Sequence, residues 1–429
     1  MNIIDRAKHF LRTLVDLGNR TAWNWRRCPH CGDTDTCKHG FYPRNPWFFE
    51  GRKTIWVQRH LCYPCRRTYS ERLAILVRGG WYAREVRRYG VDQWQHGGGS
   101  YRRIAEFVRS WLGKQERWHF WRPLDPNPST SERCYLGAST IHRWIDKAGR
   151  EAQKTVKGQL DTVQTSGQMG TDGLWARLQK RAKRVVLILV DNVTGIVYPP
   201  VVVKGEESSE EWKKLFERAK QAGLKLDEIR GVSSDGAKGL IGYLSSKLEW
   251  VNRQSCVWHI WRSLGGEISA RVYEATEGLT GQAAKAARKA VREEITGLVR
   301  AVMDATSEAG AFEALAQLER HRLGKNLARE ITRHLDSLLV YLMGYNAGLT
   351  RVGPEWCWRD FRLRLGRGRN QGSDERLERM SLVWAIHRNF TPAQWRSERK
   401  RKYRHPGMSP LEVAGHPPDN VSYLDALAV

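Results

Sequence analysis

The pattern of apolar and polar residues predicts alternating strands and helices in the middle of the chain. Two apolar runs, RVVLILV and IVYPPVVV, flank a turn at residues 191–195 and predict a hairpin of two buried strands. The following segment, SSEEWKKLFERAKQAG, begins with Ser, carries acids in its first turn and ends at Gly223, as helices commonly do. The sequence therefore predicts two buried strands followed by an amphipathic helix.

The next stretch continues this alternation. Residues 229–234 predict a strand, and Asp235 stands at its end. Residues 237–248 predict a helix with one apolar face, formed by Leu240, Ile241, Leu244 and Leu248. A further strand-like run leads into Cys256 and His259. With a first strand that contains Asp172, the order is strand, strand, strand, helix, strand, helix, strand, which is the order of an RNase H-like α/β domain.

Two acids occupy positions that suit catalysis. Asp235 lies where α/β sheets place catalytic groups, because ligands bind outside the carboxyl ends of the strands. Its carboxylate could instead cap the helix that follows, a position that Asp favours. Glu355 comes after Gly353 and Pro354, near the start of another predicted helix. There it could simply complement the helix dipole, so both acids keep a structural alternative.

Helical patterns on either side of this region set the predicted domains. Residues 1–20 predict one amphipathic helix, and residues 262–345 read as almost entirely helical, which predicts an all-helical insertion. The RNase H-like core is expected to comprise residues 151–261 and 346–395. Residues 396–429 are basic and contain Pro, and they predict a loosely held tail.

Two Cys-x-x-Cys pairs identify the segment 21–80 as a candidate zinc ribbon. Four thiolates can hold Zn²⁺ in a tetrahedral site with no open position, so the site would be structural. These thiolates belong to Cys28, Cys31, Cys62 and Cys65. Between the pairs, KTIWVQRHLC predicts a strand that leads into the second pair. Redox-active pairs are the alternative, and four other residues are possible ligands: Cys37, His30, His39 and His60.

Residues 81–150 predict a helix-turn-helix region for DNA binding, with an insert between its two helices. Ser100 is the expected N-cap of the first helix, and a polar, Pro-rich insert follows at residues 122–129. The second helix begins with small polar residues, which is typical of a recognition helix that enters the major groove. Its base-facing candidates are Ser139, Thr140, His142 and Arg143. A plain pair of helices is the alternative.

The charge of the chain indicates a polyanion partner. The formal net charge is +26, with 72 Lys and Arg against 46 acids, so double-stranded DNA is the expected partner. No run of about 18 apolar residues is present, which argues against a membrane span. Residues 1–20 lack the apolar region and cleavage site of a signal peptide. Eight Cys, four of them in Cys-x-x-Cys pairs, fit a reducing compartment, and a cytoplasmic location is expected.

One series of motifs extends over residues 165–395. It consists of Asp172-Gly, Ser234-Asp235-Gly-x-x-Gly-Leu, Gln254-x-Cys256-x-x-His259, a helical stretch, and Glu355 followed by an Arg-rich helix. This series resembles the Mutator-type bacterial insertion-sequence transposases, which are DDE enzymes with an RNase H-like core. The resemblance implies that Asp172, Asp235 and Glu355 bind metal and that Cys256 and His259 lie beside them. Residues 351–354 depart from the family, because Arg-Val-Gly-Pro replaces the usual Asn and Thr ahead of Glu355.

This resemblance implies the function and the partners of the protein. A transposase of this kind binds the terminal inverted repeats of its element, cuts the ends by hydrolysis and joins the freed 3′-hydroxyl to target DNA. Three converging carboxylates require hard cations, so two Mg²⁺ or Mn²⁺ ions are expected in the active site. Because two ends must be held at once, a homodimer or higher homo-oligomer on the bacterial nucleoid is expected.

Several alternatives remain open at this point. Asp191, in the turn of the predicted hairpin, rivals Asp172 as the first acid. Three later acids rival Glu355: Asp360, Asp374 and Glu375. For the whole protein, the other hypotheses are a domesticated DNA-binding regulator with an inactive core and an RNase H-like nuclease without strand transfer.

Overall fold

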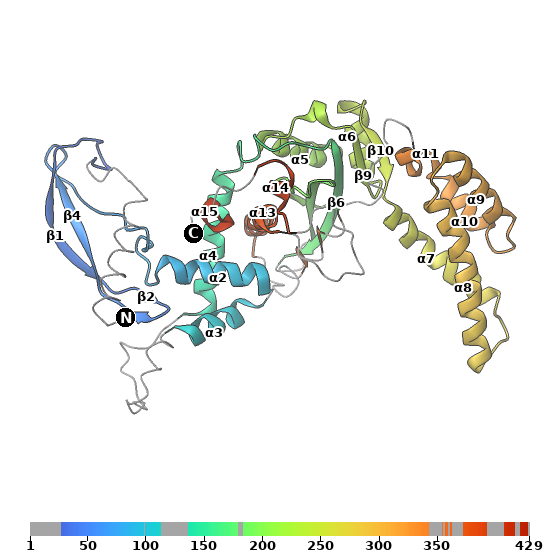
Figure 1. Cartoon of the computed structure of the whole chain (residues 1–429), viewed down its shortest axis with the longest axis horizontal. Coiled ribbons are helices and arrows are strands. Elements are labelled where there is room, and N and C mark those ends of the chain that lie inside the picture. The colour runs from blue at the N-terminus through green and yellow to red at the C-terminus, as the bar shows by residue number, and fades with distance from the viewer. Residues whose placement is uncertain are drawn as a thin grey trace. The chain divides into compact units, whose positions relative to one another are not determined.

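The computed structural model describes residues 27–97, 99–112, 136–178, 183–342, 354, 357–358, 361–362, 372–392, 407–416 and 421–427 (Figure 1). The chain divides into two compact units, an N-terminal unit of residues 1–148 with 428–429 and a C-terminal unit of residues 149–427. The predictions for residues 1–20, for the insert at 122–129, and for Glu355 and Asp360 lie outside the described residues. No helix in the described ranges combines the length and the apolar character that crossing a membrane requires.

The N-terminal unit begins with short antiparallel strands. Strands β1 (Thr36–Arg44), β4 (Ile55–Cys62) and β5 (Thr68–Ser70) form a sheet in the order β1-β4-β5. Strands β2 (Trp47–Phe48) and β3 (Gly51–Arg52) form a separate small ladder. The predicted strand ahead of the second Cys pair is therefore β4, the centre of the sheet. The apolar core beside it is small and consists of Phe48, Val57, Leu76 and Ala83.

Three helices complete the N-terminal unit. They are α2 (Arg84–Gly97), α3 (Tyr101–Trp111) and α4 (Ala138–Lys154), of which α2 was not predicted as a separate helix. The hydroxyl of Ser100 accepts a hydrogen bond from the Arg103 backbone N–H at 3.2 Å, so Ser100 is the N-cap of α3, as predicted. Residues three or four positions apart form the buried faces of α3 and α4: Ile104, Ala105, Val108, Ile141, Ile145 and Ala148.

Helices α2 and α4 approach each other closely at Gly90. A Cβ atom at this position would lie 2.8 Å and 2.9 Å from two ring carbons of Trp144. Gly90→Ala is therefore expected to destabilise the protein by about 1–3 kcal/mol through overpacking, although Ala favours helix by about 1 kcal/mol. Differential scanning calorimetry should detect this as a lower melting temperature.

Gly266 provides the matched control, because it lies within a helix and no atom would come within 4 Å of an added Cβ. Gly266→Ala is expected to be neutral or stabilising by up to about 1 kcal/mol. Equal melting temperatures for Gly90→Ala and wild type would show that the two helices tolerate the added methyl group.

The C-terminal unit contains a mixed five-stranded sheet. Its strands are β6 (Gln168–Arg177), β7 (Lys183–Asp191), β8 (Val201–Lys204), β9 (Gly231–Ser234) and β10 (Asn252–Ser255). They lie in the order β10-β9-β6-β7-β8. The three strands β6, β7 and β8 are antiparallel neighbours, whereas β9 pairs with β6 and β10 pairs with β9 in parallel. The predicted alternation of three strands, helix, strand, helix and strand is therefore present.

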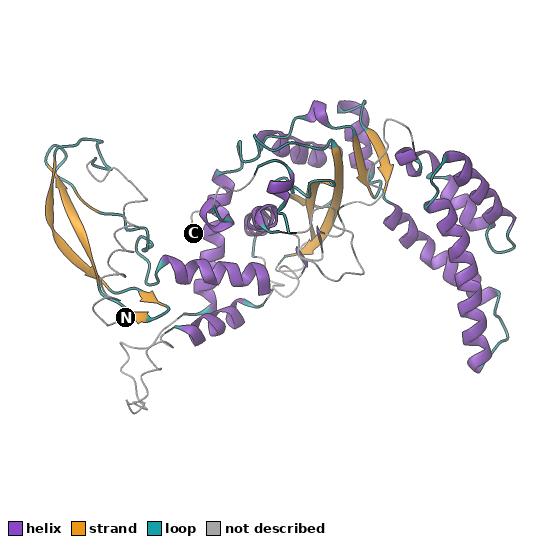
Figure 2. Cartoon of the chain, viewed as in Figure 1, coloured by secondary structure: helices purple, strands orange, loops and turns teal. Residues whose placement is uncertain are grey.

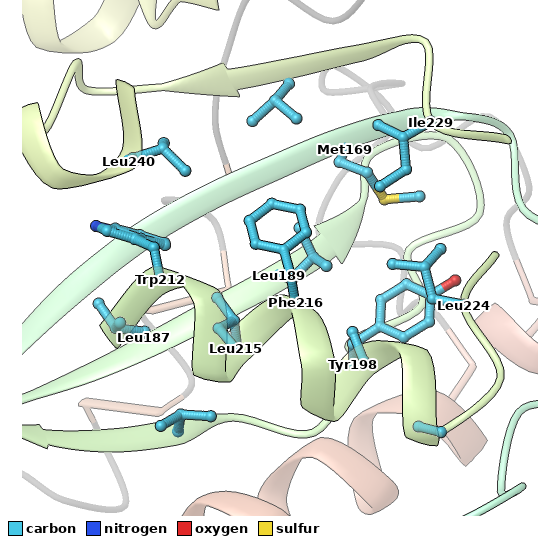
Figure 3. Close-up of a cluster of buried hydrophobic side chains, with 14 of the residues drawn as sticks. Met169, Leu187, Leu189, Tyr198, Trp212, Leu215, Phe216, Leu224, Ile229 and Leu240 are labelled. Atoms are coloured by element: carbon cyan, nitrogen blue, oxygen red, sulfur yellow. The ribbon is translucent and has the colours of Figure 1, made fainter. Parts of the chain in front are cut away.

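Helices cover both faces of this sheet. Helices α5 (Ser209–Gln221) and α6 (Lys238–Lys247) share one apolar cluster with alternate residues of β7, such as Leu187 and Leu189, as Figure 3 shows. The intervening residues of β7 pack on the opposite face against α13 (Asp374–Phe390) and the aromatic rings of Trp358 and Phe361. Because β7 is buried on both faces, it reads as a continuous apolar run.

An all-helical segment follows β10. It consists of α7 (Val257–Glu274), α8 (Gly281–Met303), α9 (Glu308–Arg320), α10 (Lys325–Thr332), α11 (Leu335–Leu338) and the 3₁₀ turn η5 (Val340–Leu342) (Figure 2). This helical insertion, residues 257–342, has its own apolar core. It covers the edge strand β10, where the amide of Gln254 donates to the Leu338 carbonyl at 2.8 Å and accepts from the Tyr341 N–H at 3.0 Å. An exposed sheet edge is thereby avoided.

The described part of the C-terminal tail is packed rather than loose. Helix α14 (Pro410–Val413) brings Leu411 and Ala414 into the apolar cluster between the sheet and α5. The carbonyl of Ala414 also accepts a hydrogen bond from the Gln164 backbone N–H at 3.1 Å. The expectation of a loosely held tail is therefore wrong for residues 407–416, because two apolar side chains anchor this segment.

Candidate active site and metal centre

The sheet brings Asp172 and Asp235 together. Strand β6 pairs in parallel with β9, and Gly170 is the register partner of Ser233. Each acid comes two residues after this pair, so the register alone places the two acids side by side. Asp172 is 7% exposed within β6, whereas Asp235 is exposed just beyond the end of β9. The two strands thus present one buried and one exposed carboxylate at the same point.

An imidazole completes this group. The ligand atoms of Asp172, Asp235 and His259 all lie within 4.8 Å of one another. His259 is in the first turn of α7, so it follows the end of β10 at Ser255 instead of belonging to a strand. Cys256 is 1% exposed and its backbone N–H donates to the Ser234 carbonyl at 2.7 Å. Of Cys256 and His259, only the His259 side chain belongs to the group with the two acids, whereas Cys256 holds the start of α7 against β9.

The two carboxylates have different surroundings. One oxygen of Asp172 accepts from the Gly173 backbone N–H at 2.8 Å, and the other accepts from the indole N–H of the buried Trp358. Asp235 accepts from the Ala237 backbone N–H at 3.1 Å. Ala237, not Asp235, occupies the N-cap position of α6, and α6 has no side-chain cap. Helix capping therefore does not explain Asp235.

Asp191, the rival of Asp172, has a structural environment. It is fully buried at the end of β7. Its carboxylate accepts five hydrogen bonds of 2.7–3.3 Å, from the hydroxyls of Thr165 and Ser166 and from the backbone N–H groups of Ser166, Val193 and Thr194. Because its oxygens accept hydrogen bonds from the turn and from the segment ahead of β6, the geometry favours Asp172 as the acid that faces Asp235.

This difference predicts opposite mutant phenotypes. Asp191→Ala leaves several buried donors without an acceptor and is expected to destabilise the protein by roughly 3–5 kcal/mol. Asp172→Asn keeps the size of the side chain and is expected to retain the fold. Thermal unfolding of both variants measures this contrast. A stable Asp191→Ala protein would contradict the structural assignment of Asp191.

The later acids within the described residues also form structural contacts. Asp374 accepts from the Arg184 side chain at 2.6 Å and lies 3.6 Å from the Lys204 ammonium. Glu375 accepts from the Ser373 hydroxyl at 3.1 Å in the first turn of α13. Neither belongs to the group with Asp172 and Asp235.

One acid beside the site was missed from the sequence. Glu207 lies directly before Ser208, the N-cap of α5, and its carboxylate is half-buried. Burial, together with the negative charges of Asp235 and Asp172, raises the pKa of Glu207 to about 7. The sequence offers only an acid near a helix start, which is common at any helix N-terminus. Its proximity to the other acids depends on the packing of distant segments.

The four predicted zinc ligands form one cluster in the N-terminal unit. The sulfur atoms of Cys28, Cys31, Cys62 and Cys65 all lie within 4.8 Å of one another. Two pairs are closer, with Cys28 and Cys65 at 3.6 Å and Cys31 and Cys62 at 3.5 Å. The chemistry of four thiolates suits a structural Zn²⁺ ion. Cys37 lies on β1 outside this cluster, and the His60 ring bonds to Glu71 at 3.2 Å.

The four base-facing candidates lie in the first turns of α4. Ser139 and Arg143 are exposed, and the Arg143 side chain donates to the Thr140 hydroxyl at 3.4 Å. The ring of His142 packs edge-on against Tyr101 of α3, with ring centres 5.4 Å apart. Ile141 and Ile145 point into the core. Within the described residues, Ser139 and Arg143 are therefore the two exposed members of this set, whereas Thr140 and His142 are partly buried.

The topology and the paired acids define the C-terminal unit as a mixed α/β domain with a candidate metal-binding active site. Comparison with protein families shows that residues 200–276 match the family described as Transposase, Mutator family. This segment extends from β8 into α7 and contains Asp235 and His259. The chain therefore carries a Mutator family transposase domain, which implies an RNase H-like core and a function in DNA transposition. No curated protein matched the chain.

Proposed function

We propose that the protein is the DNA transposase of an insertion sequence, which cuts the ends of its element and joins them to target DNA. The observation that carries this proposal is the group formed by Asp172, Asp235 and His259, two of which lie in the segment that matches the transposase family. Two neighbouring carboxylates, one on β6 and one just beyond the end of the parallel strand β9, are a suitable arrangement for metal-dependent chemistry at phosphorus.

The donor atoms of this group fit divalent cations. Two carboxylates offer the oxygen ligands that Mg²⁺ and Mn²⁺ prefer, and the His259 nitrogen is compatible with Mn²⁺ as the softer of the two. We infer that Glu355 supplies a third carboxylate, because Trp358, three residues later, bonds to Asp172. Bound cations would activate water or a DNA 3′-hydroxyl and stabilise the leaving oxygen.

Asp172, Asp235 and His259 have different proposed roles in this site. Asp172 is fixed by Gly173 and Trp358, so its position does not depend on a ligand. Asp235 is exposed and is therefore accessible to a DNA phosphate. His259 supplies the third possible ligand atom, a ring nitrogen, from the first turn of α7. No nucleophilic side chain is required, because water serves the cutting step and the freed 3′-hydroxyl serves the joining step at the same site.

DNA binding is assigned to the N-terminal unit. Residues 1–148 contain 27 Lys and Arg against 13 acids, whereas the helical insertion, residues 257–342, is close to neutral with 12 against 11. A basic domain suits contact with phosphates. We therefore propose that the zinc ribbon positions the protein and that α4 meets the terminal inverted repeats through Ser139, Thr140, His142 and Arg143.

The domains proposed from the sequence keep their roles in this scheme. The zinc ribbon (21–80) and the helix-turn-helix region (81–150) bind DNA, and the core (151–261 and 346–395) performs the chemistry. The helical insertion separates the two parts of the core in sequence. Because both ends of an element must be held together, the active form is proposed to be a homodimer or a higher homo-oligomer.

Cleavage of a linear DNA that carries the presumed element ends tests this function. The wild-type protein is expected to nick the ends with Mg²⁺ or Mn²⁺, to give a joined product with target DNA, and to do neither in EDTA. Nicking without a joined product would identify a nuclease without strand transfer. Binding without nicking in either metal would favour a DNA-binding regulator.

A further inference from the structure

The segment between β8 and α5 brings Glu207 to the acids. This carboxylate lies against the backbone of Gly173, the residue that follows Asp172. A Cβ atom at Gly173 would lie 2.8 Å from Glu207 Cδ and 3.0 Å from its Oε2. Any side chain other than hydrogen at this position would therefore displace the carboxylate. The glycine beside the first acid leaves room for Glu207.

A second glycine, Gly239, leaves room for the backbone of Glu207 and Ser208. A Cβ atom at Gly239, in the first turn of α6, would overlap the Glu207 carbonyl and would lie 2.6 Å from the Ser208 carbonyl carbon. Gly239 is four residues after Asp235. Two glycines, each close in sequence to one of the two acids, thus allow residues 207 and 208 to sit between β6 and α6.

One oxygen of the Glu207 carboxylate, Oε2, is buried at this position without a hydrogen bond from the described part of the chain. Buried polar atoms are usually paired, because an unpaired one loses its hydration without compensation. Burial is also the main cause of the raised pKa of Glu207, and the negative charges of Asp235 and Asp172 are further causes. A cation between the carboxylates would relieve both the desolvation and the repulsion.

We propose that Glu207 is a further carboxylate of the active site and helps to bind a second divalent cation, next to the one held by Asp172, Asp235 and His259. Glu207 lies outside the group in which Asp172, Asp235 and His259 are all within 4.8 Å of one another. That separation suits a ligand of a second ion better than a further ligand of the first. The proposal deepens the proposed function, because it rests on the same metal-dependent site.

Titration of the full-length, zinc-loaded protein with Mn²⁺ tests this role without reference to activity. Free Mn²⁺ is measured by its electron paramagnetic resonance signal. Wild type is expected to bind two ions per active site, and Glu207→Gln is expected to bind one of them at least about tenfold more weakly. The neighbouring acid Glu206 is exposed, so Glu206→Gln is the matched control and is expected to bind as wild type does.

Several results would overturn the inference. Equal Mn²⁺ affinity and stoichiometry for wild type and Glu207→Gln would exclude Glu207 as a ligand, as would equal losses in the Glu206→Gln control. A lower melting temperature of metal-free Glu207→Gln would point to a structural role, because removal of a charge that faces two acids should not destabilise the fold. Loss of Mn²⁺ in Glu207→Gln alone supports the inference even if wild type cuts no element end, in which case the proposed transposase function fails by itself.

Discussion

Asp235→Asn is expected to lower the rate of metal-dependent end cleavage by about three orders of magnitude or more, while end binding stays within about twofold of wild type. The amide keeps the size of the side chain and removes the negative charge that binds a cation. Asp235 is exposed and makes a single backbone hydrogen bond, to Ala237, so the fold should persist. Nicking of labelled end DNA and a mobility-shift assay measure the two quantities separately.

Asp227→Asn is the matched control for this experiment. Asp227 is an exposed acid in the short 3₁₀ turn that precedes β9, outside the metal-binding group. The control should cleave as wild type does. If Asp235→Asn retains wild-type cleavage, the assignment of the paired acids is wrong, and if it loses end binding as well, the cleavage result reports on DNA binding instead of chemistry.

Cys62→Ser is expected to remove zinc from the protein and to unfold the sheet formed by β1, β4 and β5. Structural zinc sites contribute about 10–16 kcal/mol of apparent binding free energy, which is coupled to folding. In the described part of the chain, the apolar core beside this sheet has four buried residues, Phe48, Val57, Leu76 and Ala83, so it is too small to replace that contribution. Zinc content by plasma mass spectrometry should fall from one ion per chain towards none, and end binding should fall with it.

Cys37→Ser distinguishes the proposed ligands from a nearby thiol. Cys37 lies on β1, opposite Leu61 and outside the four-sulfur cluster. Its replacement should leave the zinc content unchanged. A Cys62→Ser protein that still holds one zinc ion per chain would show that another residue completes the site or that the metal lies elsewhere.

The elements that depend on local sequence could be predicted. The apolar run of β7, the capped helix α5 and the N-cap at Ser100 each have a signal within a few residues, and all three are present in the structure. The four clustered Cys were also predictable, because Cys-x-x-Cys spacing is itself a local constraint. The sequence placed Asp172 on the first strand and Asp235 at the end of the fourth, and the parallel pairing of β6 with β9 that brings them together is seen in the structure.

The features that depend on long-range packing could not be predicted. Glu207 approaches the acids because two glycines, Gly173 and Gly239, allow it, and nothing within residues 204–208 indicates this. Asp191 is structural because Thr165 and Ser166, about 25 residues earlier, donate to it. The start of α7 was also missed, since the apparent strand continues in sequence although pairing with β9 ends at Ser255.

Helix α7 connects the group of Asp172, Asp235 and His259 to the helical insertion. Its first turn carries His259, and its later turns place Leu264, Ile268 and Val272 in the core of the helical insertion. Helix α7 is one continuous helix of 18 residues, so it is expected to move as a rigid unit. A displacement of the helical insertion would therefore also move the imidazole of His259. The position of the His259 imidazole beside Asp172 and Asp235 is thus coupled to the packing of the helical insertion, because the same helix belongs to both.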